Sequence, residues 1–191
     1  MIETLIQLDH ALTITINHFH APWLDALMEL ISGKFTWIPL YALLLFLMYR
    51  KLGWKVLIAA AIFIALSILL SDQISVAFKN SFERLRPCHH PELSELLHLA
   101  AGCGGKFGFV SSHAANTMAL AIFVSMMMRK NWVSLLMLSY AILNSYSRVY
   151  LGKHYVADVV GGMMLGALIG YGMYWGARYF IRQWINAGFE T

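Results

Sequence analysis

The stretch WKVLIAAAIFIALSILLSDQISVAF, residues 54–78, is an apolar run long enough to cross a bilayer. A transmembrane helix needs about 20 mostly apolar residues, and this run lacks the alternation of a barrel strand. Four further runs of this kind lie at about Phe35–Met48, Ala114–Met128, Trp132–Tyr146 and Val156–Phe180. Only helices and closed barrels satisfy the backbone in lipid. The sequence therefore predicts an all-α polytopic membrane helix bundle with about five transmembrane helices.

The composition also indicates a membrane protein. Of the 191 residues, 59% are hydrophobic and 13% are charged, against a usual charged fraction of about 25%. The mean hydropathy is +0.62, and a soluble domain of this size could not cover so much apolar side chain with polar surface. The net charge of +4 is therefore no sign of nucleic-acid binding. We expect one integral-membrane domain over 1–191, with membrane lipids as partners and no nucleic acid.

The first residues predict a helix at the membrane surface. Ile2, Leu5, Leu8, Leu12 and Ile16 recur near helical spacing, which favours an amphipathic helix lying in the interface. A first soluble helix packed on the rest of the chain is the alternative. The segment has no basic n-region and no clean apolar h-region, so we expect no signal peptide.

Basic residues in the connecting turns predict the orientation. They follow the first, third and fifth apolar runs, at Arg50, Lys51, Lys55, Arg129, Lys130, Arg178 and Arg182. With alternating topology these turns share one side, which the positive-inside rule makes cytoplasmic. The amino terminus and the loops of about 79–112 and 148–153 then face outward. Those loops are basic too, and we interpret their charges as needed for chemistry rather than as neutralising the loop acids Glu83, Glu92 and Glu95.

Three short polar segments are predicted to meet on the outward face. Their chemically useful members are Lys79 and Arg86, then Ser111, Ser112 and His113, then Ser147, Arg148, His154 and Asp158. Two arginines and a lysine suit a doubly charged phosphate, because planar guanidinium groups match its oxygens. Ser111 or Ser112 precedes an apolar helix and is a candidate N-cap, where free N–H groups attract phosphate.

The histidines add a nucleophile and an acid. His154 and Asp158 are spaced i, i+4, so both point to one face if a helix begins near His154. The aspartate can then accept from one imidazole nitrogen and leave the other free to attack. His113 remains as acid and base for the leaving oxygen. Each signal alone is weak, because a serine before a helix is usually only a cap and a lone Asp158 can simply favour a helix N-terminus.

The joint arrangement resembles the type 2 phosphatidic acid phosphatase superfamily, whose motifs read K-x6-R-P, P-S-G-H and S-R-x5-H-x3-D. Lys79 and Arg86-Pro87 match the first motif, and Ser147-Arg148, His154 and Asp158 match the third, so the motif-bearing region is 79–158. The middle motif departs, because Val110 replaces proline and Ser112 replaces glycine. The loss of glycine matters more, since glycine lets a backbone N–H approach phosphate closely.

The resemblance implies a metal-independent lipid phosphatase without a cofactor. His154 would attack phosphorus and form a phosphohistidine, Asp158 would orient it, and His113 would protonate the departing oxygen and then activate water. The phosphoryl oxygens would be held by Lys79, Arg86, Arg148, Ser111 and the amide of Ser112. Undecaprenyl diphosphate is the lead substrate, with phosphatidylglycerol phosphate, phosphatidate and lipid A phosphate as alternatives. The implied location is a bacterial inner membrane, with the site facing the periplasm or exterior.

Two other functions remain open at this stage. A lipid-phosphate binding or transport-like bundle would use the same cations, although binding alone needs no oriented histidine pair. The second alternative is a phosphatase for small soluble phosphate esters, although a site at the level of the lipid headgroups suits a lipid substrate better.

Cysteines and glycines supply the remaining expectations. Cys88 and Cys103 lie in the long outward loop and can form a disulfide that pins it beside Arg86. The alternative is a metal site built from "CHH" at 88–90 with His98 and Cys103. The stretch GCGGKFG, 102–108, is interpreted as a flexible connector that could shape the substrate entrance. Glycines recur every four residues at Gly162, Gly166 and Gly170, which predicts close helix packing within the bundle.

Overall fold

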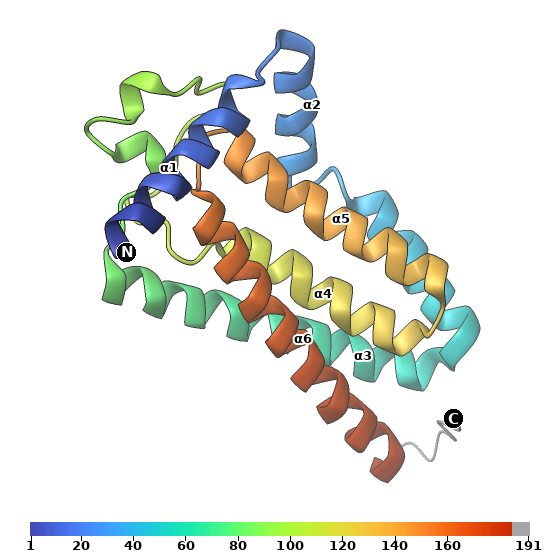
Figure 1. The fold of residues 1–191 in the computed structure, drawn as a ribbon. Coiled ribbons are helices and arrows are strands. Elements are labelled where there is room, and N and C mark those ends of the chain that lie inside the picture. The colour runs from blue at the N-terminus through green and yellow to red at the C-terminus, as the bar shows by residue number, and fades with distance from the viewer. Residues whose placement is uncertain (185–191) are drawn as a thin grey trace.

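A computed structural model describes residues 1–184, and these form helices and loops without a β-strand (Figure 1). The helices are α1 Ile2–His18, α2 Pro22–Ser32, α3 Ile38–Phe82, α4 Ser112–Met128, α5 Asn131–Tyr150 and α6 Val156–Trp184, with the short 3-10 helices η1 Pro87–His89 and η2 Ser94–Leu96 between α3 and α4. The predicted all-α bundle is confirmed. By length and hydropathy α3 and α6 are able to cross a membrane, and α4 is a shorter apolar helix. The count of five spans stays a prediction.

The longest helix, α3, is bent into two arms. Gly53 has φ 77° and ψ 167°, a backbone conformation that glycine adopts without a clash of its side chain. The first two predicted spans fall on these arms. The first arm begins at Ile38 rather than about Phe35, with a proline in its first turn, where a missing N–H costs no helical hydrogen bond.

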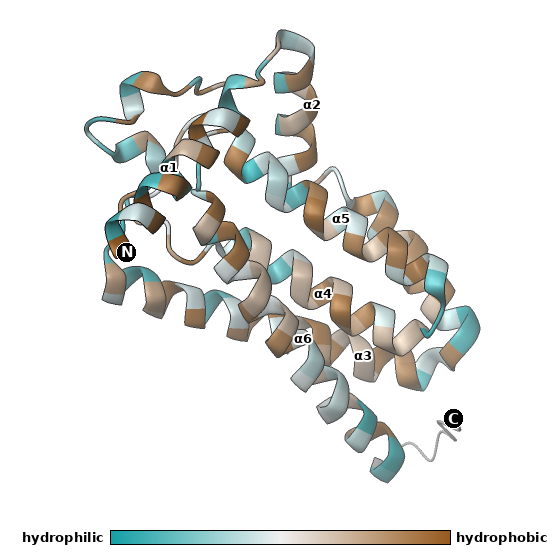
Figure 2. Ribbon diagram, in the orientation of Figure 1, coloured by the Kyte–Doolittle hydropathy of each residue, from teal (hydrophilic) through white to brown (hydrophobic). Residues whose placement is uncertain are grey.

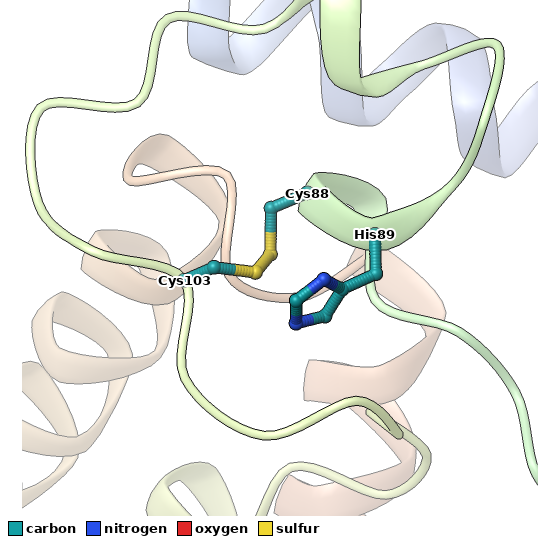
Figure 3. Close-up of side chains that lie close together, drawn as sticks. All are labelled: Cys88, His89 and Cys103. Carbon is teal, nitrogen blue, oxygen red and sulfur yellow. A yellow bond between two sulfur atoms is a disulfide. The ribbon is translucent and has the colours of Figure 1, made fainter.

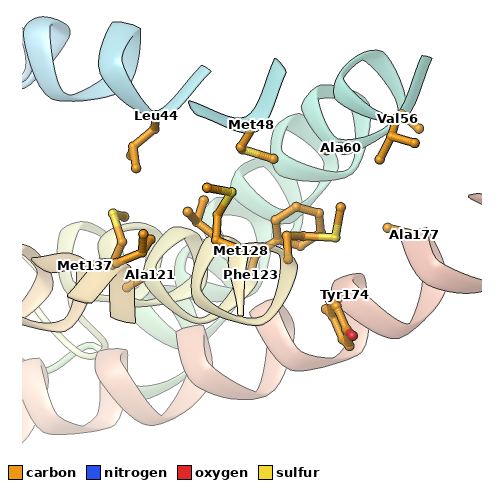
Figure 4. Close-up of a cluster of buried hydrophobic side chains, with 14 of the residues drawn as sticks. Leu44, Met48, Val56, Ala60, Ala121, Phe123, Met128, Met137, Tyr174 and Ala177 are labelled. Atoms are coloured by element: carbon orange, nitrogen blue, oxygen red, sulfur yellow. The ribbon is translucent and has the colours of Figure 1, made fainter. Parts of the chain in front are cut away.

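Helix α4 lies at the centre of the bundle and contacts α3, α5 and α6. Its buried side chains include Ala121, Phe123 and Met128, which join residues of the other three helices in the main apolar core (Figure 4). A helix that is apolar on all sides requires neighbours on all sides. This central position brings the N-terminus of α4 between the ends of α3 and α6.

The glycines of α6 face α4. An added Cβ at Gly162, Gly166 or Gly170 would clash with backbone carbonyls at Ser111, Ala115 and Ala119 respectively. Lipid tails are as apolar as leucine, so such close contact between small residues is a main source of stability inside a membrane. The predicted packing role of these glycines is confirmed.

Helix α1 packs on α5 and α6 with its polar face inward. Asp9, Thr13 and Asn17 are buried, whereas Leu5 and Leu8 are 60% and 55% exposed. Asn17 donates to the backbone oxygens of Tyr150 at 2.7 Å and His98 at 2.9 Å. The helix is therefore amphipathic, as expected, but packed in the opposite sense to a soluble helix, with its apolar face turned outward.

Polar residues gather at the two ends of the bundle. Figure 2 shows hydrophilic residues at the turn between α4 and α5, at the bend of α3 and toward the end of α6, with apolar ribbon between. The Lys51 ammonium donates to the carbonyl of Met128, which joins two of the basic turns at one end. The loop between α3 and α4 lies with α1 and α2 at the other end (Figure 1).

We predict opposite effects for two glycine substitutions on α6. Gly166→Ala should lower the free energy of unfolding by about 1–3 kcal/mol, because the methyl group overpacks against α4. Gly172→Ala, where a Cβ meets nothing within 4 Å, should be neutral or stabilising by up to about 1 kcal/mol, since alanine favours a helix. Thermal unfolding in one detergent measures both, and equal shifts would contradict the close contact.

Candidate active site

The loop after α3 is held by backbone pairing to the segment before α4. Arg86 N donates to Lys106 O at 3.1 Å, and Gly108 N donates to Arg84 O at 2.9 Å. Within this pair, Arg86 also donates from Nε to Phe107 O at 3.2 Å. Burial lowers the pKa of Arg86 from its ordinary value, yet arginine stays protonated in proteins. The loop therefore presents a fixed cation.

A disulfide closes the same loop. Cys88 and Cys103 are bonded, with their Cα atoms 5.9 Å apart, as Figure 3 shows. Arg86 donates from one terminal nitrogen to Cys103 O at 3.2 Å, so the bridge pins the loop beside Arg86, as expected. The alternative metal site is wrong for this state of the protein. His89 is close, but both sulfurs are bonded to each other and His98 lies 2.8 Å from Asp25 instead.

The structure brings His154 and Asp158 together. Asp158 Oδ2 lies 3.4 Å from His154 Nδ1 and accepts from Tyr155 N at 3.1 Å. Helix α6 begins at Val156, so Asp158 sits in its first turn and reaches back to the N-terminal backbone in the manner of a capping box. His154 lies in the loop just before the helix and is 2% exposed.

The charge state of His154 follows from this burial. Desolvation, the largest cause, acts together with the cations Arg86 and Arg148 and lowers the pKa of His154 to about 4, although Asp158 opposes this shift. The imidazole is therefore neutral at ordinary pH. With Nδ1 facing the carboxylate, Nε2 is the nitrogen left to react.

The serines and Lys79 meet at the N-terminus of α4. Lys79 lies on the last turn of α3, which continues four residues past the predicted Phe78, and its ammonium donates to the hydroxyl of Ser112. Ser111 is the N-cap, since its Oγ accepts from Ala114 N at 3.5 Å, and it is fully buried. Ser112, which departs from the family motif, thus contributes an acceptor that places a lysine.

Arg148 lies on the last turn of α5 rather than in the predicted loop, because that helix continues to Tyr150. One terminal nitrogen donates to Ser32 Oγ, at the end of α2, at 2.6 Å. Its Nε is buried and has no hydrogen-bond partner among the described residues. Spacing gave no sign of Ser32, which is 116 positions away.

His113 lines a cavity of about 580 Å³, whose walls come mainly from α3, α4 and α5. Most of the lining is apolar, including Leu44, Ile64 and Leu120. The polar lining lies partly beside His113 on α4, where Asn116 donates to Asp72 at 2.8 Å. The motif residue His113 therefore borders a space between the helices whose walls are mostly apolar.

Two residues that contact the predicted site, Arg84 and Gly108, were not predicted from the sequence. Arg84 donates to Asp158 Oδ1 at 2.8 Å and to Asp9 Oδ2 at 2.6 Å, not to the loop acids. Gly108 belongs to the stretch interpreted as a flexible connector, yet it packs against His154 and Asp158. A Cβ there would lie 2.7 Å from Asp158 Oδ2 and 3.5 Å from His154 Nδ1. The sequence marked Gly108 only as a glycine two positions before Val110, which stands at a motif position.

We predict that Gly108→Ala displaces the Asp158 carboxylate. The phosphate release expected from the motifs should fall about 10–100-fold, since small misplacement of reacting groups has large effects on rate. Gly105→Ala, where a Cβ meets nothing within 4 Å, is the matched control in the same loop. Steady-state kinetics on both purified variants measures the effect, and equal rates would refute the close approach.

Comparisons with known proteins agree with the geometry. Residues 60–182 match the family model described as PAP2 superfamily. The chain is 39% identical to a lipid A 4'-phosphatase of Bacteroides thetaiotaomicron, covering 100% of this chain and 84% of that protein. It is 32% identical to an undecaprenyl-diphosphatase of Sulfolobus acidocaldarius, covering 82% of this chain and 72% of that protein.

A solved structure shows the same fold. The PAP2 type phosphatidylglycerolphosphate phosphatase from Bacillus subtilis superposes with a TM-score of 0.69 at 23% identity, covering 95% of this chain and 88% of the other. The motif residues, their placement at one end of the bundle and these likenesses lead to one conclusion. The chain belongs to the PAP2 superfamily and is a membrane lipid phosphatase, a hydrolase of phosphoric esters.

Proposed function

We propose that the protein removes phosphate from a membrane lipid through a phosphohistidine on His154, without a metal. The observation that carries the proposal is the His154–Asp158 pair, buried and separated by 3.4 Å, at the end of the bundle where the motif cations lie. A carboxylate on Nδ1 leaves Nε2 as an oriented, neutral nucleophile.

In the first step His154 Nε2 attacks phosphorus in line. The N–P bond forms as the P–O bond to the lipid breaks, and His113 donates a proton to the departing oxygen. In the second step neutral His113 takes a proton from water, whose oxygen attacks phosphorus. The N–P bond breaks, inorganic phosphate leaves and His154 is restored.

The cations would stabilise the charge on the phosphoryl oxygens. Arg148 Nε is a buried donor without a hydrogen-bond partner in the described part of the chain, and such a group normally indicates a ligand or water. Lys79, Arg86 and the N-terminal amides of α4 complete the set we assign to phosphate binding, with Ser111 and Ser112 shaping that helix end. Phosphoryl transfer gains most from such fixed positioning and charge.

The lipid would enter from the membrane. We infer five spans, the two arms of α3 together with α4, α5 and α6, and a surface position for α1. The apolar side chains that line the cavity below His113 suit a hydrocarbon chain whose phosphate reaches the histidines. By the positive-inside rule the site faces the periplasm or exterior of a bacterial inner membrane.

The likenesses change the lead substrate. The resemblance alone favours undecaprenyl diphosphate only because phosphatases for this lipid are common. No residue of the chain selects it. The relative named as a lipid A 4'-phosphatase matches the whole chain at 39% identity, against 32% over 82% for the one named as an undecaprenyl-diphosphatase. We therefore propose a phosphate monoester of lipid A as the lead. Undecaprenyl diphosphate, phosphatidylglycerol phosphate and phosphatidate are the alternatives.

We predict metal-independent turnover on a lipid panel. Purified protein in detergent with EDTA should release phosphate from lipid A faster than from undecaprenyl diphosphate, phosphatidylglycerol phosphate or phosphatidate. His154→Gln should lower the rate by at least about 10³-fold, because the nucleophile is lost, while lipid binding persists. Loss of activity in EDTA would refute the mechanism, and binding without release by the wild type would favour a lipid-phosphate binding or transport-like bundle.

We predict a bell-shaped pH dependence. His154 must be neutral to attack, and its lowered pKa of about 4 means that it loses its proton as pH rises through about 4. The ascending limb of kcat/KM should therefore lie near pH 4, and the descending limb should report deprotonation of the general acid His113. Initial rates from pH 3.5 to about 9 test this, and an ascending limb near the ordinary histidine value of about 6.5 would contradict the burial argument.

A further inference from the structure

We propose that Arg84 is a positioning residue for the reaction, and that with Asp9 it makes the N-terminal helix part of the catalytic apparatus. The inference rests on the proposed function of the His154–Asp158 pair. Arg84 belongs to the variable stretch between the two matched positions of the first motif, and Asp9 lies outside the motif-bearing region.

The guanidinium of Arg84 is clamped between two carboxylates. One terminal nitrogen donates to Asp158 Oδ1 at 2.8 Å and the other donates to Asp9 Oδ2 at 2.6 Å. The guanidinium carbon also lies 4.1 Å from the centroid of the Tyr155 ring. A planar fork with two directed donors and an aromatic surface beneath it fits arginine better than lysine, which can engage only part of this set.

Asp158 needs this partner because both of its oxygens are buried. Its side chain is 0% exposed, and Oδ2 serves Tyr155 N and His154. Without Arg84, Oδ1 would carry charge in a low-dielectric setting with no donor, which is costly. The carboxylate would no longer be held in one plane, and His154 Nδ1 would lose its fixed orientation although the negative charge of Asp158 stays beside it. Arg84 therefore fixes the carboxylate plane that orients the nucleophile.

Helix α1 extends the same clamp to the start of α6. Asp9 Oδ1 accepts from Ala157 N at 2.9 Å, and Thr13 Oγ1 accepts from Val156 N at 3.2 Å. The first N–H groups of a helix have no partner within it. Two side chains of α1 thus cap the helix that carries Asp158. A single aspartate holds both the helix end and the arginine that holds the catalytic aspartate.

Two competing roles for Arg84 make different predictions. A substrate-binding arginine would mainly alter KM when replaced, but both terminal nitrogens of Arg84 are already engaged by protein carboxylates. A purely structural ion pair would alter stability without altering the titration of His154. A positioning residue lowers kcat and moves the pH profile.

The direction of that movement follows from the charges around His154. Arg86 from the loop, Arg148 from α5 and Asp158 from α6 act on His154 directly. The groups around these are Arg84 from the loop, Asp9 and His10 from α1, Lys79 from α3 and His113 from α4. Removing the Arg84 cation leaves Asp158 freer to stabilise a protonated His154. The ascending limb of kcat/KM should then move to higher pH, by about one unit for a charge at this range.

The experiment compares Arg84→Gln, Arg84→Lys and Asp9→Asn with two matched controls, Arg50→Gln at the opposite end and Glu3→Gln on the exposed start of α1. We expect Arg84→Gln to lower kcat about 10–100-fold, to change KM less than about threefold and to raise the ascending limb. Arg84→Lys should recover part of the rate. Asp9→Asn, which can still cap Ala157, should lower kcat about 2–10-fold, and its combination with Arg84→Gln should be less than multiplicative.

Several outcomes would overturn the proposal. One is an Arg84→Gln variant with the kcat and the pH profile of the wild type, and another is an Arg84→Gln variant in which only KM changes. A third is a loss of kcat in Arg50→Gln or Glu3→Gln equal to that in Arg84→Gln. If the wild type releases phosphate from no lipid, the proposed function fails and the clamp is tested without turnover. Titration of ¹⁵N-labelled histidines by NMR, with His154 assigned through His154→Gln, should then show a raised pKa of His154 in Arg84→Gln, and an unchanged value would refute the clamp.

Discussion

The buried carboxylate of Asp158 is the constraint around which the site end of the molecule is organised. A charge removed from water must be paired and hydrogen-bonded to remain. Here Oδ1 is satisfied by Arg84, and Oδ2 by Tyr155 N and His154 Nδ1. The backbone oxygen of the same residue accepts from Ser111 N at 3.0 Å. One residue thus holds His154, the loop after α3 and the start of α4 in a single arrangement.

That arrangement depends on how closely α4 and α6 approach. Ser111, Ala115 and Ala119 oppose the glycines of α6, and there is no room for a methyl group between the two backbones. Contact of this kind stabilises helices where the hydrophobic effect cannot. It also sets the distance between the N-terminus of α4 and the first turn of α6. The interaction that stabilises the bundle is therefore the one that positions the N-terminal amides of α4, to which we assign phosphate binding, relative to His154 and Asp158.

The loop between α3 and α4 supplies cations that a bare helix bundle could not place. Backbone pairing between 84–86 and 106–108 and the Cys88–Cys103 bridge limit how Arg84 and Arg86 can move. Residues two apart in an extended segment point to the same side, and here both arginines reach the site, Arg84 through the carboxylates and Arg86 beside His154. Arg84 of this loop has Asp9 and Asp158 as its counter-charges rather than the acids of the loop itself.

Local length, hydropathy and fixed spacing were enough to predict the helical membrane fold, the glycine packing face and the motif residues to which we assign the site. The sequence also indicated the disulfide beside Arg86. Tertiary structure alone decided that Lys79 and Arg148 lie on helix ends, that α1 buries its polar face, and that Ser32, Arg84 and Gly108 contact the site. The physical reason is that these contacts join residues far apart in the chain. Asp9 and Asp158 are linked through Arg84. The residue pattern of one segment does not show which charges, or how much space, a distant segment will bring to it.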